Sequence, residues 1–274
     1  MNGLPQTRML LIHDSASRQT NNALRLLLLA VIVSLSCSMA TAAESGAHER
    51  TFVKALELFD QAESPDDYRA SALVLESIVA DGVRSGAVYY NLGNAWFRAG
   101  EFGRAILNYR KARPYRPRDP YLAANLQQAL ASAPGRLPDP PVPWWSHVLF
   151  WTDWFSAQTK VRLAGLSLSL SATLLILAIA LQRRSLITAM TVTLVLGVAF
   201  SAECLLNDPV QTHRAVIISE TTARKGTGKD YEPAFDQPLR DGAEFTVLNE
   251  TKDWVFGHFE GVGDGWVRKE DVAR

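Results

Sequence analysis

Cysteine is scarce in this chain of 274 residues, and its five histidines are scattered along the sequence. The two cysteines, Cys37 and Cys204, each lie in an apolar run. The first run is interpreted below as a removable signal, so the mature chain would hold no pair of thiols to oxidise. The histidines do not cluster with one another or with the cysteines at the spacings of a metal site. The sequence therefore predicts neither a disulfide nor a bound metal.

An excess of charge and a catalytic motif are also missing. Lys and Arg number 28 and Asp and Glu number 28, so no bulk attraction to nucleic acid is indicated. The segment ARKGTGKD ends like a phosphate-binding loop, but Ala223 replaces its first glycine and Asp230 its Ser or Thr. No G-x-S-x-G, no H-E-x-x-H and no Cys/His pair is present. We expect no enzyme and no cofactor.

Long apolar runs are present, at residues 24–43, 161–181 and 186–206. In the first, Arg18 and Arg25 precede the apolar core, and the run ends in small residues that include Ala40-Thr41-Ala42, the pattern of a cleavage site. We interpret residues 1–43 as a signal sequence. An uncleaved anchor is the alternative, because the basic region before the run is unusually long.

The other two runs predict a membrane hairpin. Spans at 160–181 and 186–206 each approach the ~20 residues that cross the hydrocarbon core, and residues 182–185 form the turn between them. Arg183 and Arg184 in that turn should stay cytoplasmic, which places both flanking domains on the extracytoplasmic, periplasmic side of the inner membrane. Lys160 and Arg162 at the outer end oppose this orientation. Glu203 is either a functional carboxylate or simply an interface residue.

The segment YYNLGNAWFRAGEFGRAILNYRKA, residues 89–112, matches the tetratricopeptide pattern. Gly93 and Ala105 are small because two antiparallel helices would cross there, while Trp96 and Tyr109 would fill the space on either side. Gly100 allows the turn between the helices. A weaker repeat in phase precedes this one and a closing helix follows it, so we assign residues 44–133 to tetratricopeptide repeats.

The concave face of such a stack takes up protein partners. We expect it to carry Tyr90, Asn91, Asn94, Phe97, Tyr121 and Asn125. Asparagine suits an extended peptide because its amide both donates to and accepts from a backbone. The alternative is that these asparagines only bind neighbouring helix backbone.

Basic residues crowd the second half of the repeat region. They are Arg98, Arg104, Arg110, Lys111, Arg113, Arg116 and Arg118. Such a run is either a solvated face or a basic patch for acidic lipid headgroups or an acidic partner.

Residues 134–143 are rich in proline and predict a semi-rigid linker. Residues 144–159 follow, with Trp144, Trp145, Trp151 and Trp154, and predict an aromatic helix at the membrane interface. The more specific alternative is that these tryptophans line an aromatic binding site.

From residue 207 to 274 the pattern changes to short strand-like runs between Gly, Asp and Asn turns, which predicts a small barrel. Tyr231, Phe235 and Trp254 are the candidate ligand face. In so small a barrel tryptophans such as Trp254 and Trp266 also serve as core residues.

The order of these parts resembles the BatE proteins of the Bacteroides aerotolerance (Bat) group, over residues 50–274. The segment LRDGAEFTVLNETKDWVFGHFEGVGDGWV looks like a bacterial SH3 domain, although the loop ARKGTGKDY departs from its usual form. The resemblance implies an all-α tetratricopeptide solenoid, a two-helix transmembrane hairpin and a C-terminal all-β SH3-like barrel. It also implies an adaptor for membrane proteins of the von Willebrand factor A type in envelope stress. The alternative is a peptidoglycan sensor that acts through the SH3-like domain.

Overall fold

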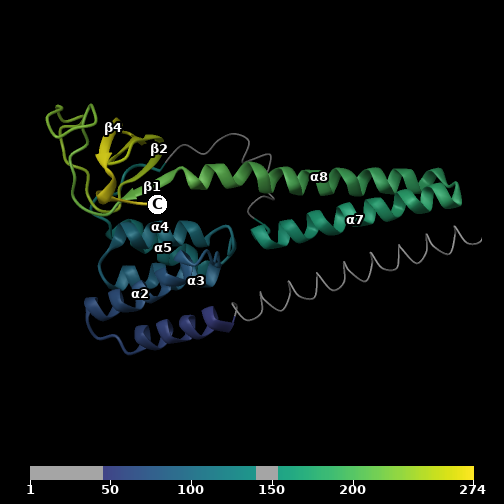
Figure 1. Ribbon diagram of the computed structural model, residues 1–274, viewed down its shortest axis with the longest axis horizontal. Helices are drawn as coiled ribbons and strands as arrows, with labels where there is room; N and C mark the ends of the chain where they lie inside the picture. Colours follow the sequence, from purple (N-terminus) through teal and green to yellow (C-terminus); the bar gives the residue numbers. More distant parts are fainter. Residues whose placement is uncertain (1–45, 140–153) are drawn as a thin grey trace, which may run out of the picture. The chain divides into compact units, whose positions relative to one another are not determined.

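The computed structural model describes residues 46–139 and 154–274, with the backbone alone at 180 and 204–212. The predicted signal sequence and most of the predicted aromatic helix lie outside these residues. The chain divides into two compact units between Val53 and Lys54. In the first, residues 46–53 are helical; the second begins with helical residues 54–60. It continues with α2 (Pro65–Ala80), α3 (Gly86–Arg98), α4 (Phe102–Ala112), α5 (Pro120–Ser132), α7 (Ala157–Leu181), α8 (Arg184–Thr212) and five β-strands (Figure 1).

Short polar residues mark where the helices of the helical region, residues 54–132, begin. Ser64 and Asp67 form a reciprocal capping box at the start of α2, in which the Ser64 N–H donates to the Asp67 carboxylate at 2.9 Å. The Asp119 carboxylate accepts from two backbone N–H groups of α5, and Pro120 follows at its first position. These devices satisfy backbone donors that a helix leaves unpaired at its start.

Close packing of α3 on α4 confirms the predicted crossing at Gly93. A Cβ atom on Gly93 would lie 2.6 Å from the Tyr109 ring, so no larger residue fits without a shift. Gly100 between the two helices has a φ of +80°, which glycine adopts without strain. In the preceding pair, Ser71 and Leu75 are buried as Ala105 and Tyr109 are, and the Ser71 hydroxyl donates to the Ala55 carbonyl at 2.7 Å. The two helix pairs therefore use equivalent core positions.

Helices α7 and α8 lie side by side, and both are long and apolar enough to cross a membrane (Figure 1). The helix α7 begins at Ala157, capped by the Ser156 hydroxyl, and α8 continues to Thr212, beyond the predicted end of the span at 206. At their shared end the Lys160 ammonium pairs with the Glu203 carboxylate, and both side chains are largely buried. The pair neutralises one of the two cations that oppose the predicted orientation.

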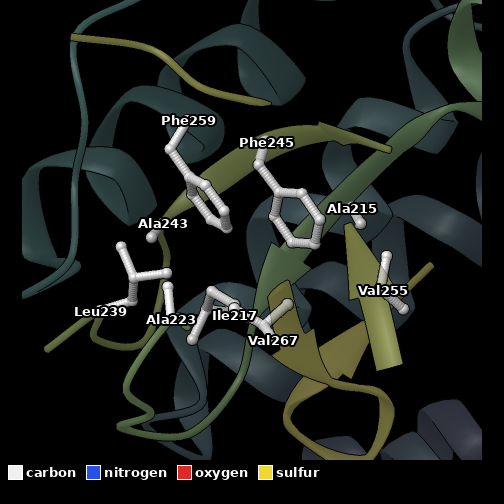
Figure 2. Packing of buried hydrophobic residues seen from close by; sticks show 9 residues of the cluster. All are labelled: Ala215, Ile217, Ala223, Leu239, Ala243, Phe245, Val255, Phe259 and Val267. Atoms are coloured by element: carbon white, nitrogen blue, oxygen red, sulfur yellow. The ribbon is translucent and has the colours of Figure 1, made fainter. Parts of the chain in front are cut away.

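The C-terminal residues form an antiparallel sheet in the order β4-β3-β2-β1-β5. Its strands are β1 (Arg214–Ile217), β2 (Glu244–Glu250), β3 (Trp254–Phe259), β4 (Gly263–Arg268) and β5 (Val272–Ala273). Their core is a cluster of nine buried apolar residues centred on Phe245 and Phe259, whose rings stack at 4.6 Å (Figure 2). A bulge between Val247 and Asn249 shifts the register of β2 on β3. We call residues 213–274 the β domain.

The β domain packs directly on α4. Glu101, at the N-cap of α4, makes no side-chain capping bond, and the Asp241 carboxylate of the β domain accepts from the Gly103 N–H at 3.0 Å instead. A Cβ on Gly103 would come within 2.4 Å of the Ile217 carbonyl oxygen, and one on Gly242 within 2.4 Å of the Ala133 methyl. Two glycines thus allow this close contact.

A second contact joins α4 to β2. The Arg110 guanidinium donates twice to the Glu244 carboxylate, at 3.0 and 2.9 Å, and both side chains are about one-fifth exposed. Two-pronged pairs of this kind fix orientation as well as distance. The helical region and the β domain therefore form one packed body.

We predict that Asp241→Ala lowers stability, because the first turn of α4 loses its cap. Loss of a cap costs about 1 kcal/mol, and a chain of this size should then melt at a temperature lower by about 2–4 °C. Asp241→Asn should avoid this loss, since its amide oxygen accepts the same bond. Tryptophan fluorescence of the full chain in detergent measures the transition, with the exposed Asp236→Ala as control.

The charge on Asp241 gives this prediction a pH dependence. Burial raises the pKa of the Asp241 carboxyl above its usual range. The ionised form therefore costs stability at neutral pH, and this cost disappears as the pH falls through the raised pKa. Asp241→Asn should exceed the wild type slightly at pH 7 and lose that advantage in acid. An advantage that grows in acid would contradict the assignment.

We predict that Glu203→Leu destabilises the hairpin strongly, because the Lys160 ammonium would lose its carboxylate partner. Breaking a buried pair costs about 3–5 kcal/mol, whereas replacing both members with apolar residues is often neutral. Lys160→Met/Glu203→Leu should therefore recover the yield of folded protein in the membrane fraction. Equal yields for the wild type and the single variant would show that the pair contributes nothing.

Candidate partner-binding face

A network of side chains links α3, α4 and α5. The Tyr109 hydroxyl donates to the Asn94 carbonyl oxygen at 2.8 Å, and the Asn125 amide donates to the same oxygen at 2.9 Å. The Asn125 amide also donates to the Tyr90 hydroxyl at 3.1 Å. Burial raises the pKa of Tyr109, so its hydroxyl remains a donor throughout the physiological range. These bonds fix the orientation of both amides.

The fixed orientation leaves two polar groups without a partner among the described residues. They are the Nδ2 donor of Asn94 and the Oδ1 acceptor of Asn125, and both side chains are half-buried. Asn91 differs, because its amide donates to the Ala87 carbonyl of its own helix at 2.9 Å. The alternative of amides bound to helix backbone thus describes Asn91, whereas Asn94 and Asn125 bind side chains.

The predicted face also carries three aromatic side chains. The Tyr90 ring lies under the Arg116 guanidinium, at 4.6 Å from its centroid, and the Phe97 ring meets Phe102 edge-on at 5.7 Å. Tyr121, the second residue of α5, is 73% exposed. We call the six predicted residues, Tyr90, Asn91, Asn94, Phe97, Tyr121 and Asn125, the Asn94 face.

A cavity of about 300 Å³ lies in the β domain. Trp254 forms part of its wall, and the charged side chains around it have both signs. They are Glu220, Asp271, Arg224, Lys229 and Arg268. A cavity with an aromatic wall and charges of both signs suits a ligand that carries an amine and a carboxylate.

The other two residues of the predicted SH3 ligand face lie elsewhere. The Phe235 ring packs against the β-domain core, edge-on to Phe259 at 5.6 Å. Tyr231 is 54% exposed and covers Gly226 and Gly228. Neither side chain contributes to the wall of the cavity. Trp266, the other tryptophan of the β domain, packs on Phe256, with 5.0 Å between the ring centroids.

A third region joins the helical region to the start of α7. The Ala157 N–H donates to the Pro114 carbonyl at 2.8 Å, and the Arg118 guanidinium lies 5.7 Å from the centroid of the Trp154 ring. Trp154 and Phe155 are both exposed immediately before the apolar helix. Basic and aromatic side chains therefore meet where the first span begins.

Sequence reasoning named the residues of the Asn94 face but not the partners that orient them. Arg116 is distant from Tyr90 along the chain. Arg268 and Asp271 reach the cavity from the end of β4 and from the short helical turn after it. In the described ranges, no group of three or more His, Cys, Asp or Glu side chains lies close enough to hold a metal ion.

The chain was compared with family models, curated proteins and solved structures, and none of the three comparisons gave a match.

Proposed function

We propose that this protein is a membrane-anchored adaptor that binds an extended segment of a partner protein on the Asn94 face. The observation that carries the proposal is the oriented pair of amides, which offers the Asn94 donor and the Asn125 acceptor side by side. A peptide backbone presents one acceptor and one donor per residue, so this pair matches it. Tyr121 adds an exposed aromatic surface of the type enriched at interfaces.

The hairpin supplies the anchor. Two candidate spans follow the helical region and precede the β domain. With the basic turn at Arg183 and Arg184 in the cytoplasm, both domains would lie on the periplasmic side of the inner membrane. Tethering to one surface raises the effective concentration for a partner in the same membrane.

The proposed assignment is a BatE-type protein, with tetratricopeptide repeats in the helical region and an SH3-like barrel in the β domain. Two helix pairs with equivalent core positions and a five-stranded antiparallel sheet support these two assignments. The resemblance suggests that the partners are membrane proteins with a von Willebrand factor A domain in an envelope stress or aerotolerance complex.

We predict that Asn94→Asp abolishes partner recovery without unfolding the protein. A carboxylate oxygen still accepts from Tyr109 and Asn125, but the donor is replaced by a charged acceptor that repels a peptide carbonyl. Crosslinking of the tagged full chain in membranes, followed by mass spectrometry, should show at least a tenfold loss of von Willebrand-type proteins, as expected for about 1.4 kcal/mol.

Asn249→Asp provides the matched control for Asn94→Asp. Its side chain is exposed on β2, and its oxygen accepts from the Glu250 N–H at 2.7 Å, a bond that Asp retains. The control should recover partners as the wild type does. Equal recovery with both variants would overturn binding at the Asn94 face.

The second candidate function is binding of cell-wall peptide, and the β-domain cavity favours it. Stem peptides of peptidoglycan carry free amines and carboxylates, which the charges of both signs could pair. Because the β domain is packed on α4, the full chain is the appropriate sample.

We predict that, if this function holds, Trp254→Leu reduces retention of the full chain on purified peptidoglycan. Trp254 forms part of the cavity wall, whereas Trp266 does not, so Trp266→Leu is the control. Melting curves establish that both variants fold. No retention of the wild type would exclude wall binding while leaving the adaptor proposal intact.

A further inference from the structure

The loop at residues 113–118 is hydrogen-bonded to the start of α7, the first candidate span. The hydrogen bond from the Ala157 N–H to the Pro114 carbonyl is 2.8 Å long, and Ala157 is the first residue of the candidate span. The Ser156 hydroxyl caps the same turn by accepting from the Thr159 N–H at 3.2 Å. The backbone of the loop is therefore fixed to a helix end that would lie at the membrane surface.

Exposed aromatic residues indicate where the start of α7 would lie relative to the lipid headgroups. Trp154 and Phe155 precede the span with 52% and 36% of their surface exposed, and Val161 is exposed one turn later. Tryptophan favours the headgroup region because its ring is apolar and its N–H is polar. The transition from headgroups to hydrocarbon thus falls close to Ala157.

Four cations of this region differ in how their charge is compensated. Lys160 is paired with Glu203, and Arg116 is paired with Asp119. Arg118 stacks near the Trp154 ring but has no carboxylate partner within the described residues. The same holds for Arg162, which is exposed on α7. It lies five residues after Ala157, about 8 Å along the helix.

A guanidinium at that depth reaches back to the phosphate level, because long basic side chains extend to the interface. Lys160 and Arg116 have carboxylate partners, whereas none of the described carboxylates pairs with Arg118 or Arg162. Both of these side chains are exposed, so each can bind an anion from outside the protein. The phosphate of a lipid headgroup is the anion present at this depth, and guanidinium binds it with paired hydrogen bonds.

We propose that Arg118, Arg162 and Trp154 form a binding site for the phosphate of an anionic phospholipid. The ring covers the lipid glycerol region, and the two guanidinium groups bind the headgroup. This site secures the helical region against the membrane surface. It rests on the membrane placement of the hairpin and not on partner binding by the Asn94 face.

The test measures lipid binding to the full chain in detergent by native mass spectrometry. Phosphatidylglycerol should bind at least about tenfold more tightly than phosphatidylcholine, since each basic residue near an anionic surface contributes appreciably. Arg118→Gln/Arg162→Gln should reduce this preference to none, and Arg118→Lys/Arg162→Lys should retain most of it. Arg84→Gln/Arg240→Gln removes the same charge from two other exposed positions and should retain the preference.

Two further ligands identify the source of the anion. Soluble glycerol phosphate should compete only weakly if the acyl chains and Trp154 contribute; full competition would indicate a site for a free phosphate compound and overturn the lipid proposal. A poly-glutamate peptide that displaces phosphatidylglycerol would indicate an acidic protein partner, with the same consequence. A preference for phosphatidylglycerol that survives Arg118→Gln/Arg162→Gln would also overturn it. Partner recovery in the Asn94→Asp experiment is a separate readout, so the two proposals fail independently.

Discussion

The packing of the β domain on α4 is the constraint on which the rest of the structure outside the two candidate spans depends. One carboxylate, Asp241, caps a helix from a distant part of the chain, and one ion pair, Arg110 with Glu244, fixes the orientation. Between them Gly103 and Gly242 bring the two backbones into direct contact. The chain leaves the helical region, passes through the hairpin and returns to the same body. Both ends of the hairpin are therefore tied to a single packed unit.

Because of this packing, the candidate binding surfaces lie on different elements of the chain. One side of α4 is covered by the β domain, and the other packs on α3. The Asn94 face is built on α3 and α5, so contact with the β domain does not use its amides. The cavity at Trp254 is formed by β-domain residues alone. A partner, a wall peptide and a lipid would therefore engage different residues.

Local features were predictable from sequence because their causes are local. Gly93 is small where α3 meets Tyr109, Gly100 has a positive φ, and the strand runs appear as antiparallel strands. The partners of Asp241, Arg110 and Arg116 could not be predicted in this way. These contacts join residues that are distant along the chain or depend on the direction of a side chain, and the periodicity of a sequence encodes neither. For the same reason Phe235 was predicted at a ligand face, while its ring packs on the core. The function and the family stay predictions from resemblance.

The start of α7 shows how ion pairing distinguishes two cations that the sequence pattern treats alike. Taken along the sequence, Lys160 and Arg162 weaken the positive-inside argument equally. In the structure they differ, because Glu203 pairs with Lys160 across the hairpin while Arg162 faces outward. In the lipid proposal an anionic headgroup would compensate the charge of Arg162. Glu203 is the counter-ion of a largely buried lysine near the start of the first candidate span.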